Sequence, residues 1–258
     1  MKIVSENAII VGLEKVDAEL LNKFPALKVL GCNATGLDHI DLEECKKRGI
    51  KIISLKDYPL FLSTVTSTSE HCMGLILALM RNYRIALNPP YKDREEYKGH
   101  TLSDKTLGII GFGRVGKQLK KMAVGFSMTV ITHDKGEPYL DNLLEESDII
   151  SLNIPLDNNE GFFTKEMFMK MKPTACIINT SRDRIIAKGA LKWVLENGII
   201  SGAAVDFVED SELLEYSQTH HNLILTNHIA GNTFEDRQCT EDFIINVVNN
   251  YLENEIKS

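Results

Sequence analysis

Short apolar runs alternate with amphipathic segments along most of this chain. Apolar runs of about four to eight residues are typical of buried strands, and segments with apolar positions three and four apart are typical of helices. Because strands and helices alternate, a parallel sheet joined by helical crossovers is expected, and the fold class is α/β. The expected strands are the runs 8–11, 27–31, 50–54, 105–110, 130–134, 148–152, 176–179, 203–206 and 223–226. The expected helices are 18–24, 41–48, 67–83, a helix starting near 114, a helix closing at 143–147, 165–171, 188–197 and 234–255.

The pattern divides the chain into two domains. The long helix at 67–83 is followed by the chain-breaking pair Pro89-Pro90, so residues 63–88 are expected to form the passage between the domains. The tail helix can return to pack on the first domain. We therefore expect a smaller domain of residues 1–63 with 235–258, and a larger, doubly wound domain of residues 64–234.

A glycine motif, Gly111-Phe112-Gly113-Arg114-Val115-Gly116, lies between an expected strand and an expected helix. Gly111 permits the tight strand-to-helix turn, Gly113 leaves room for a pyrophosphate, and Gly116 permits close packing of the helix on the strand. The free N–H groups of the helix would face the anion. The motif predicts a bound dinucleotide; the alternative interpretation is an ordinary turn with a surface aspartate nearby.

Asp134 closes the next apolar run and predicts which dinucleotide is bound. Its carboxylate can accept hydrogen bonds from a ribose diol and would repel a 2′-phosphate, so NAD is favoured over NADP. Lys135 beside it weakens that preference.

Composition excludes several classes of function. The 258 residues have a formal net charge of −7 without a long Lys/Arg block, so nucleic acid is not an expected partner. The five cysteines form no CxxC pair, so neither a metal site nor a disulfide framework is indicated. The N-terminal residues lack the apolar core of a signal peptide, and the most apolar helix is too short to span a bilayer. A soluble cytoplasmic protein without membrane contact is expected.

The ends of the later strands carry residues suited to hydride transfer. His228 can exchange the proton of an alcohol, because imidazole titrates near neutral pH. Arg182 can hold a carboxylate through two parallel hydrogen bonds. The alternative interpretations are a histidine that caps a strand end and an arginine exposed on a loop.

Several segments in chain order resemble those of the D-isomer-specific 2-hydroxyacid dehydrogenases, and the resemblance covers nearly the whole chain. The segments are 35–41, 69–71, 176–182, 202–206 and 225–233. Within this family the chain resembles the phosphoglycerate dehydrogenase-like members. The resemblance implies a Rossmann-type NAD domain and a smaller flavodoxin-like α/β substrate domain. It implies that Arg182 binds the substrate carboxylate, that His228 is the acid/base, and that Asp206 lies near the nicotinamide ribose.

The family pattern also assigns binding residues. Backbone N–H groups near Ala34, Thr35 and Gly36 would bind the substrate carboxylate from the smaller domain. The expected cofactor-binding residues are Gly111, Gly113, Arg114, Val115, Gly116, Asp134, Ile154, Pro155, Thr180, Ser181, Asp206 and Gly231. The segment 92–98 corresponds to a dimer arm in the family or is simply a charged surface helix; a homodimer is expected.

The chain departs from the family at several positions. The glutamate that pairs with the histidine falls on Ser211, so Glu209, Asp210 or Glu212 would have to replace it, and Glu212 is favoured. Asp183 replaces the glycine after the arginine, and Asn227 replaces the proline before the histidine. We also expect a first domain without its opening strand and helix, and a short loop after Asp134.

These features lead to two main hypotheses. The first is an NAD-dependent oxidoreductase that interconverts a small D-2-hydroxy acid and its 2-oxo acid, such as glyoxylate, hydroxypyruvate or 3-phosphoglycerate. The second is an NAD-sensing binding protein of the same fold, against which the presence of both Arg182 and His228 argues. A weaker alternative is an oxidation that needs no proton carrier. We interpret His71 as a packing residue, the pair His220-His221 as solvated loop, and Trp193 as core or interface.

Overall fold

A computed structural model describes residues 1–87 and 93–257 of the chain, with the side chains of 255–257 excepted. The chain forms two compact units, Met1–Val65 with Thr233–Ser258 and Thr66–Asn232. The sequence analysis places these boundaries at 63/64 and 234/235. Part of the segment 92–98 lies outside the described residues, which include the short helix η2 (Arg94–Tyr97).

The smaller unit is built on a four-stranded sheet in the order β1-β2-β3-β4. Strands β2, β3 and β4 are parallel, as expected, whereas β1 pairs with β2 in the antiparallel sense. The pattern of residues did not predict β1, because only part of this strand is buried. The strands are β1 (Lys2–Ser5), β2 (Ala8–Val11), β3 (Val29–Cys32) and β4 (Lys51–Ser54).

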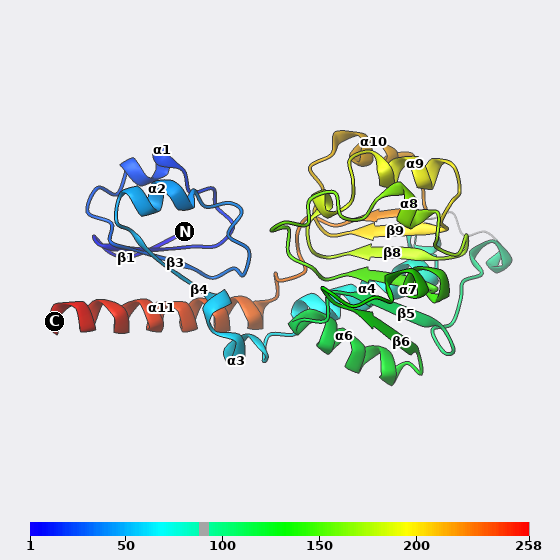
Figure 1. Cartoon of the computed structure of the whole chain (residues 1–258), viewed down its shortest axis with the longest axis horizontal. Helices are drawn as coiled ribbons and strands as arrows, with labels where there is room; N and C mark the ends of the chain where they lie inside the picture. The colour runs from blue at the N-terminus through cyan, green and yellow to red at the C-terminus, as the bar shows by residue number, and fades with distance from the viewer. Residues whose placement is uncertain (88–92, 258) are drawn as a thin grey trace. The chain divides into compact units, whose positions relative to one another are not determined.

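Helices cover both faces of the small sheet (Figure 1). Alternate strand residues point to opposite faces, so Ile9 and Leu30 pack with α1 (Ala18–Asn22) and α2 (Leu42–Lys47). Ile10 and Val29 pack with α11 (Phe234–Lys257) on the other face. The tail helix therefore packs on the sheet of the smaller unit.

Capping residues fix where the helices of the small unit begin. Asp17 accepts a hydrogen bond from the backbone N–H of Leu20, and Asp41 accepts one from Glu44. After β4, a 3-10 turn, η1 (Leu55–Asp57), and the helix α3 (Pro59–Leu62) lead out of the unit.

The larger unit holds a six-stranded sheet in the order β10-β9-β8-β7-β5-β6, and every pairing in it is parallel. The chain first adds β6 on one side of β5 and then crosses to add β7 on the other. The gap between the ends of β5 and β7 is therefore the switch point, where open α/β sheets bind ligands. The strands are β5 (Thr106–Ile110), β6 (Thr129–His133), β7 (Ile149–Leu152), β8 (Cys176–Asn179), β9 (Gly202–Val205) and β10 (Leu223–Leu225).

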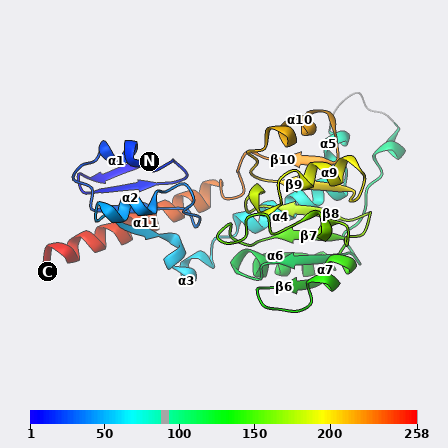
Figure 2. The same ribbon diagram turned by 45° about the horizontal axis from the view of Figure 1, so that its top comes forward.

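Helices cover both faces of this sheet (Figure 2), and a cluster of buried side chains fills each face. One face is covered by α4 (Ser67–Met80) and α6 (Arg114–Gly125). The other is covered by α7 (Leu140–Glu146), α8 (Lys165–Phe168), α9 (Ala190–Glu196) and α10 (Ser211–Thr219). Phe163 and Phe168, both fully buried with ring centroids 4.7 Å apart, fill the second cluster. The doubly wound α/β fold is confirmed.

Some helix boundaries differ from the prediction for local reasons. The helix expected over 67–83 ends at Met80, because Asn82 adopts a left-handed conformation with φ of 52° before a short helix, α5 (Tyr83–Ala86). The helix α10 was not predicted; Asp210 begins it by accepting a hydrogen bond from the N–H of Glu212. Within the described residues, no helix combines the length and apolarity needed to cross a membrane.

Candidate active site

The glycine motif forms the turn between β5 and α6. Gly111 has φ of 95°, and a Cβ placed on it would lie 2.6 Å from the carbonyl oxygen of Asn153. A Cβ on Gly116 would lie 2.4 Å from the carbonyl oxygen of Gly111. Both positions therefore require glycine for the fold itself, and the predicted packing role of Gly116 is supported by this geometry.

Gly113 differs, because a Cβ there would meet nothing within 4 Å. It precedes the first turn of α6, a twelve-residue helix whose free N–H groups favour an anion. The protein itself does not need glycine at this position. The open space is what the pyrophosphate of a dinucleotide needs.

Asn153 adds an unsatisfied polar group at the switch point. Its Nδ2 donates to the carbonyl oxygen of Ser151 at 3.2 Å and to Ser151 Oγ at 3.0 Å. Its Oδ1 is buried and has no hydrogen-bond partner among the described residues. A buried acceptor in this state is suited to a donor from a ligand. Together with the space at Gly113, this group fits a dinucleotide, so the residues present are suited to NAD.

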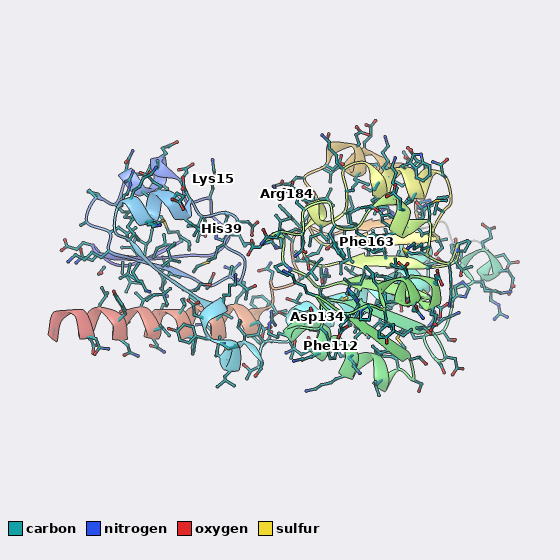
Figure 3. The ribbon with its side chains drawn as sticks, viewed as in Figure 1. Lys15, His39, Phe112, Asp134, Phe163 and Arg184 are labelled. Atoms are coloured by element: carbon teal, nitrogen blue, oxygen red, sulfur yellow. The ribbon has the colours of Figure 1, made fainter. Side chains whose placement is uncertain are left out.

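Asp134 lies exposed after β6, the edge strand of the sheet. Its Oδ1 accepts from the backbone N–H of Lys135 at 2.8 Å, and its own N–H donates to Glu137 Oε2 at 2.8 Å. Two carboxylates therefore lie at this strand end, where the sequence analysis recognised one. Asp134 lies at the same edge of the sheet as Phe112 and Arg184, which follow other strands (Figure 3).

A buried asparagine shapes the loop that carries Arg182. Asn179, at the end of β8, is 1% exposed; its Oδ1 accepts from the N–H of Ser181 at 3.0 Å, and its Nδ2 donates to the carbonyl oxygen of Arg182 at 2.8 Å. Ser181 Oγ donates to Leu152 O at 3.2 Å, which ties the loop to β7. Arg182 is half-buried. Asn179 is not among the predicted site residues, although an asparagine within an apolar strand is a visible signal.

Asp206, at the end of β9, organises the next loop. Its carboxylate is 1% exposed and accepts hydrogen bonds from Thr226 Oγ1 at 2.6 Å and from the backbone N–H groups of Ile229 and Ala230 at 2.9 Å each. His71 Nε2 lies 3.2 Å from Asp206 Oδ1. Burial alone would raise the pKa of Asp206, but the hydrogen bonds from His71, Thr226 and the two amides outweigh it and hold the pKa well below its usual value.

His228 sits in the loop that Asp206 holds. Its φ is 54°, in the left-handed region, and its backbone N–H donates to the carbonyl oxygen of Asp206 at 2.6 Å. The imidazole is half-buried, 4.8 Å from the ring of Phe207 between centroids. Asp206 thus binds three consecutive residues, 228–230, through its backbone and its side chain. The contact of Asp206 with the cofactor stays a prediction, because its carboxylate accepts its hydrogen bonds from this loop and from His71.

The acidic loop after Asp206 is tied down in three ways. The N–H of Glu209 donates to Asp183 Oδ2 at 2.7 Å, and Asp210 caps α10. Glu212 Oε2 accepts from Lys192 Nζ at 2.9 Å, and this contact lowers the pKa of Glu212. The pairing of Glu212 with His228 therefore remains a prediction. Lys192 competes with His228 for the Glu212 carboxylate. Asp183, Glu209 and Glu212 line a cavity of about 530 Å³.

The remaining predicted residues lie on loops after strands. In the smaller unit, Ala34 follows β3, and its carbonyl oxygen accepts from Ser54 Oγ at 3.4 Å and from Cys32 Sγ at 3.7 Å. Thr35 is exposed and Gly36 half-buried. In the larger unit, predicted residues at strand ends and at the start of α6 are Arg114, Val115, Ile154, Pro155, Thr180 and Gly231. The Thr180 hydroxyl lies beside the buried thiol of Cys72, whose pKa is raised to about 11 by burial.

Comparisons with known proteins agree with this arrangement. Residues 73–230 match the family model of the D-isomer specific 2-hydroxyacid dehydrogenase, NAD binding domain. The chain is 36% identical over 251 residues to a glyoxylate reductase of Thermococcus litoralis, covering 87% of this chain and 74% of that protein. It is 32% identical over 254 residues to a hydroxypyruvate reductase of Thermotoga maritima, covering 91% and 81%.

A solved structure extends the similarity to the fold. The D-lactate dehydrogenase of Aquifex aeolicus, complexed with NAD and lactic acid, superposes with a TM-score of 0.79 at 28% identity, covering 97% of this chain and 84% of that one. The glycine turn, the residues at the strand ends and these similarities converge. The chain belongs to the D-isomer-specific 2-hydroxyacid dehydrogenase family and is an NAD-dependent oxidoreductase that transfers hydride between 2-hydroxy acids and 2-oxo acids.

Proposed function

We propose that Arg182 binds the carboxylate of a small 2-oxo acid and that His228 donates the proton when the acid is reduced to its D-2-hydroxy form. The observation that carries the proposal is the order of three neighbouring strands. Arg182 follows β8, Asp206 follows β9 and His228 follows β10, and these strands lie side by side in the sheet. Their carboxyl ends share the edge at which the glycine turn lies.

The residues divide the reaction between them. NAD, when bound in its reduced form, supplies the hydride that adds to the carbonyl carbon. The planar guanidinium of Arg182 matches a carboxylate and can also polarise the neighbouring carbonyl oxygen. His228 gives its proton to that oxygen as the hydroxyl forms, and takes it back in the reverse direction.

The loop that holds His228 supports this role. A left-handed backbone conformation is unfavourable at a residue other than glycine. It is maintained where several surrounding contacts hold the backbone in that conformation. Here the N–H groups of 228, 229 and 230 all donate to Asp206. Such a backbone conformation fixes the direction in which the side chain of His228 leaves the chain, as the proposed role requires.

We further propose that the N–H groups of Ala34, Thr35 and Gly36 bind the substrate carboxylate, and that glyoxylate and hydroxypyruvate are substrates. The names of the two curated relatives support this choice. We also propose a homodimer in the cytoplasm. Five free cysteines, four of them buried, support a reducing compartment.

The test follows NADH absorbance with a panel of 2-oxo acids in wild type and variants. His228→Ala is expected to lower kcat by about 10²- to 10⁴-fold, the usual contribution of a general acid. Arg182→Ala is expected to raise KM for the acid by about 10²-fold or more, as expected for a lost bidentate contact.

Matched controls are His221→Ala and Arg184→Ala, which remove the same types of side chain from exposed positions. Both are expected to keep the wild-type rate. Tight NADH binding without turnover on any acid would favour an NAD-binding sensor. Light scattering on a sizing column tests the dimer.

A further inference from the structure

His71 is the histidine that the sequence analysis assigned to packing, and the structure gives it polar partners. It lies on α4, with 18% of its side chain exposed. Its Nε2 lies 3.2 Å from Asp206 Oδ1 and 3.2 Å from Thr226 Oγ1. Both partners hold the loop that carries His228.

The direction of each hydrogen bond follows from the chemistry of the groups. The pKa of Asp206 is held low by its contacts, so its carboxylate is ionised and can only accept. The single hydrogen of the Thr226 hydroxyl goes to Asp206 Oδ1 at 2.6 Å. Oγ1 can therefore only accept from the imidazole. His71 consequently carries a hydrogen on Nε2 and donates it toward both oxygens.

Because Asp206 is charged and buried, the hydrogen bond from His71 matters for its stability. A carboxylate that is 1% exposed must have its lone pairs satisfied by donors, because water does not reach it. Its Oδ2 accepts from the N–H of Ala230, and its Oδ1 accepts from Ile229, Thr226 and His71. Thr226, Ile229 and Ala230 lie in the loop after β10, whereas His71 donates from α4, a helix packed on the sheet.

We propose that His71 is a positioning residue of the reaction. By donating from α4 to Asp206 and Thr226, it fixes the carboxylate around which residues 228–230 fold, and so fixes the place of the His228 imidazole. The proposal rests on the proposed role of His228 as acid/base.

The test compares His71→Gln with His71→Leu. The Gln amide can place an N–H near the position of Nε2, whereas Leu has a similar bulk and no donor. His71→Leu is expected to lower kcat by about 10- to 100-fold, the effect of a small misplacement of a reacting group. The dissociation constant for NADH is expected to stay within about threefold, because the variant leaves the glycine turn and Asn153 unchanged. His71→Gln is expected to recover most of kcat.

A His228→Ala background separates this proposal from the proposed function. If His71 acts through His228, His71→Leu has no further effect on the residual rate of His228→Ala. An equal loss in both backgrounds, or a His71→Leu enzyme within about twofold of wild type, overturns the role of His71. If His228→Ala is itself fully active, the acid/base role fails instead.

A further variant keeps the test decisive if His71→Leu does not fold. The Asn side chain is shorter than Gln and does not reach the position of Nε2. His71→Asn is therefore expected to have a lower kcat than His71→Gln at a similar melting temperature. Equal kcat values in these two variants would also overturn the proposal.

Discussion

Asp183 Oδ2 accepts a 2.7 Å hydrogen bond from the backbone N–H of Glu209. Asp183 follows the substrate-binding candidate Arg182, and Glu209 lies in the acidic loop after Asp206. A residue that departs from the family pattern therefore joins two loops of the site. Its other oxygen accepts from the N–H of Arg184 at 2.7 Å, which fixes its rotamer.

Removal of this link should impair the reaction more than the fold. In Asp183→Ala the loop 207–210 loses an anchor worth about 1–1.5 kcal/mol, so kcat/KM is expected to fall by roughly 5- to 10-fold. Asp183→Asn keeps an acceptor oxygen and should lose less. Steady-state kinetics with glyoxylate measures both. An Asp183→Ala enzyme with wild-type kcat/KM would show that the link does not serve the site.

Two glycines of the motif should respond oppositely to alanine. Gly113→Ala places its Cβ in open space, so the melting temperature should stay within about 2 °C, while the dissociation constant for NADH should rise by roughly tenfold or more. Gly116→Ala drives its Cβ against the Gly111 carbonyl and should cost about 1–3 kcal/mol of stability. Thermal unfolding and NADH fluorescence titration give both values. Unchanged NADH binding in Gly113→Ala would contradict the assignment of the anion position.

The two carboxylates after β6 should both oppose NADPH. With a dinucleotide bound as the glycine motif predicts, each carboxylate would meet a ribose 2′-phosphate with a repulsion of roughly 1 kcal/mol at an exposed site. Glu137→Gln is therefore expected to tighten NADPH binding by about fivefold, and Asp134→Ser with Glu137→Gln by about 10- to 30-fold, since Lys135 then attracts the phosphate unopposed. Glu145→Gln, on the exposed side of α7, is the control. Equal NADPH affinity in all variants would exclude this origin of selectivity.

The contribution of Asp206 to the stability of the folded protein should decrease as the pH falls. Its pKa in the folded protein lies below the ordinary value of 3.8, so folding favours the charged form. The stabilisation is therefore fully present above about pH 5 and is lost as the pH falls below about 4 toward the folded pKa.

Asp206→Asn removes the charge and leaves backbone N–H groups of the His228 loop poorly paired, at roughly 1–3 kcal/mol each. The melting temperatures of wild type and Asp206→Asn, measured from pH 3 to 8, should differ most at neutral pH and converge toward pH 3. A constant difference across this range would mean that Asp206 is not stabilised in its ionised form.

The sequence by itself determined the architecture and the class of chemistry. Apolar runs and the 3.6-residue helical period are local patterns, so the strand Cys176–Asn179 and the start of helix α11 at Phe234 were predicted at the observed positions. The glycine motif is also local, because its spacing corresponds to one strand-to-helix turn. Arg182, Asp206 and His228 were recognised because parallel strands end at one edge.

Only the tertiary structure decided which groups contact one another. His71 and Asp206 are separated by most of the larger unit in sequence, and the packing of α4 on the sheet brings Nε2 within 3.2 Å of the carboxylate. The partner of Glu212 likewise depends on how α9 and α10 lie beside each other, and that of Asp183 on how the loops after β8 and β9 meet. Periodicity reports which face of an element is buried. A hydrogen bond across two elements depends on their separation and rotation, which the packed core sets and no local pattern encodes.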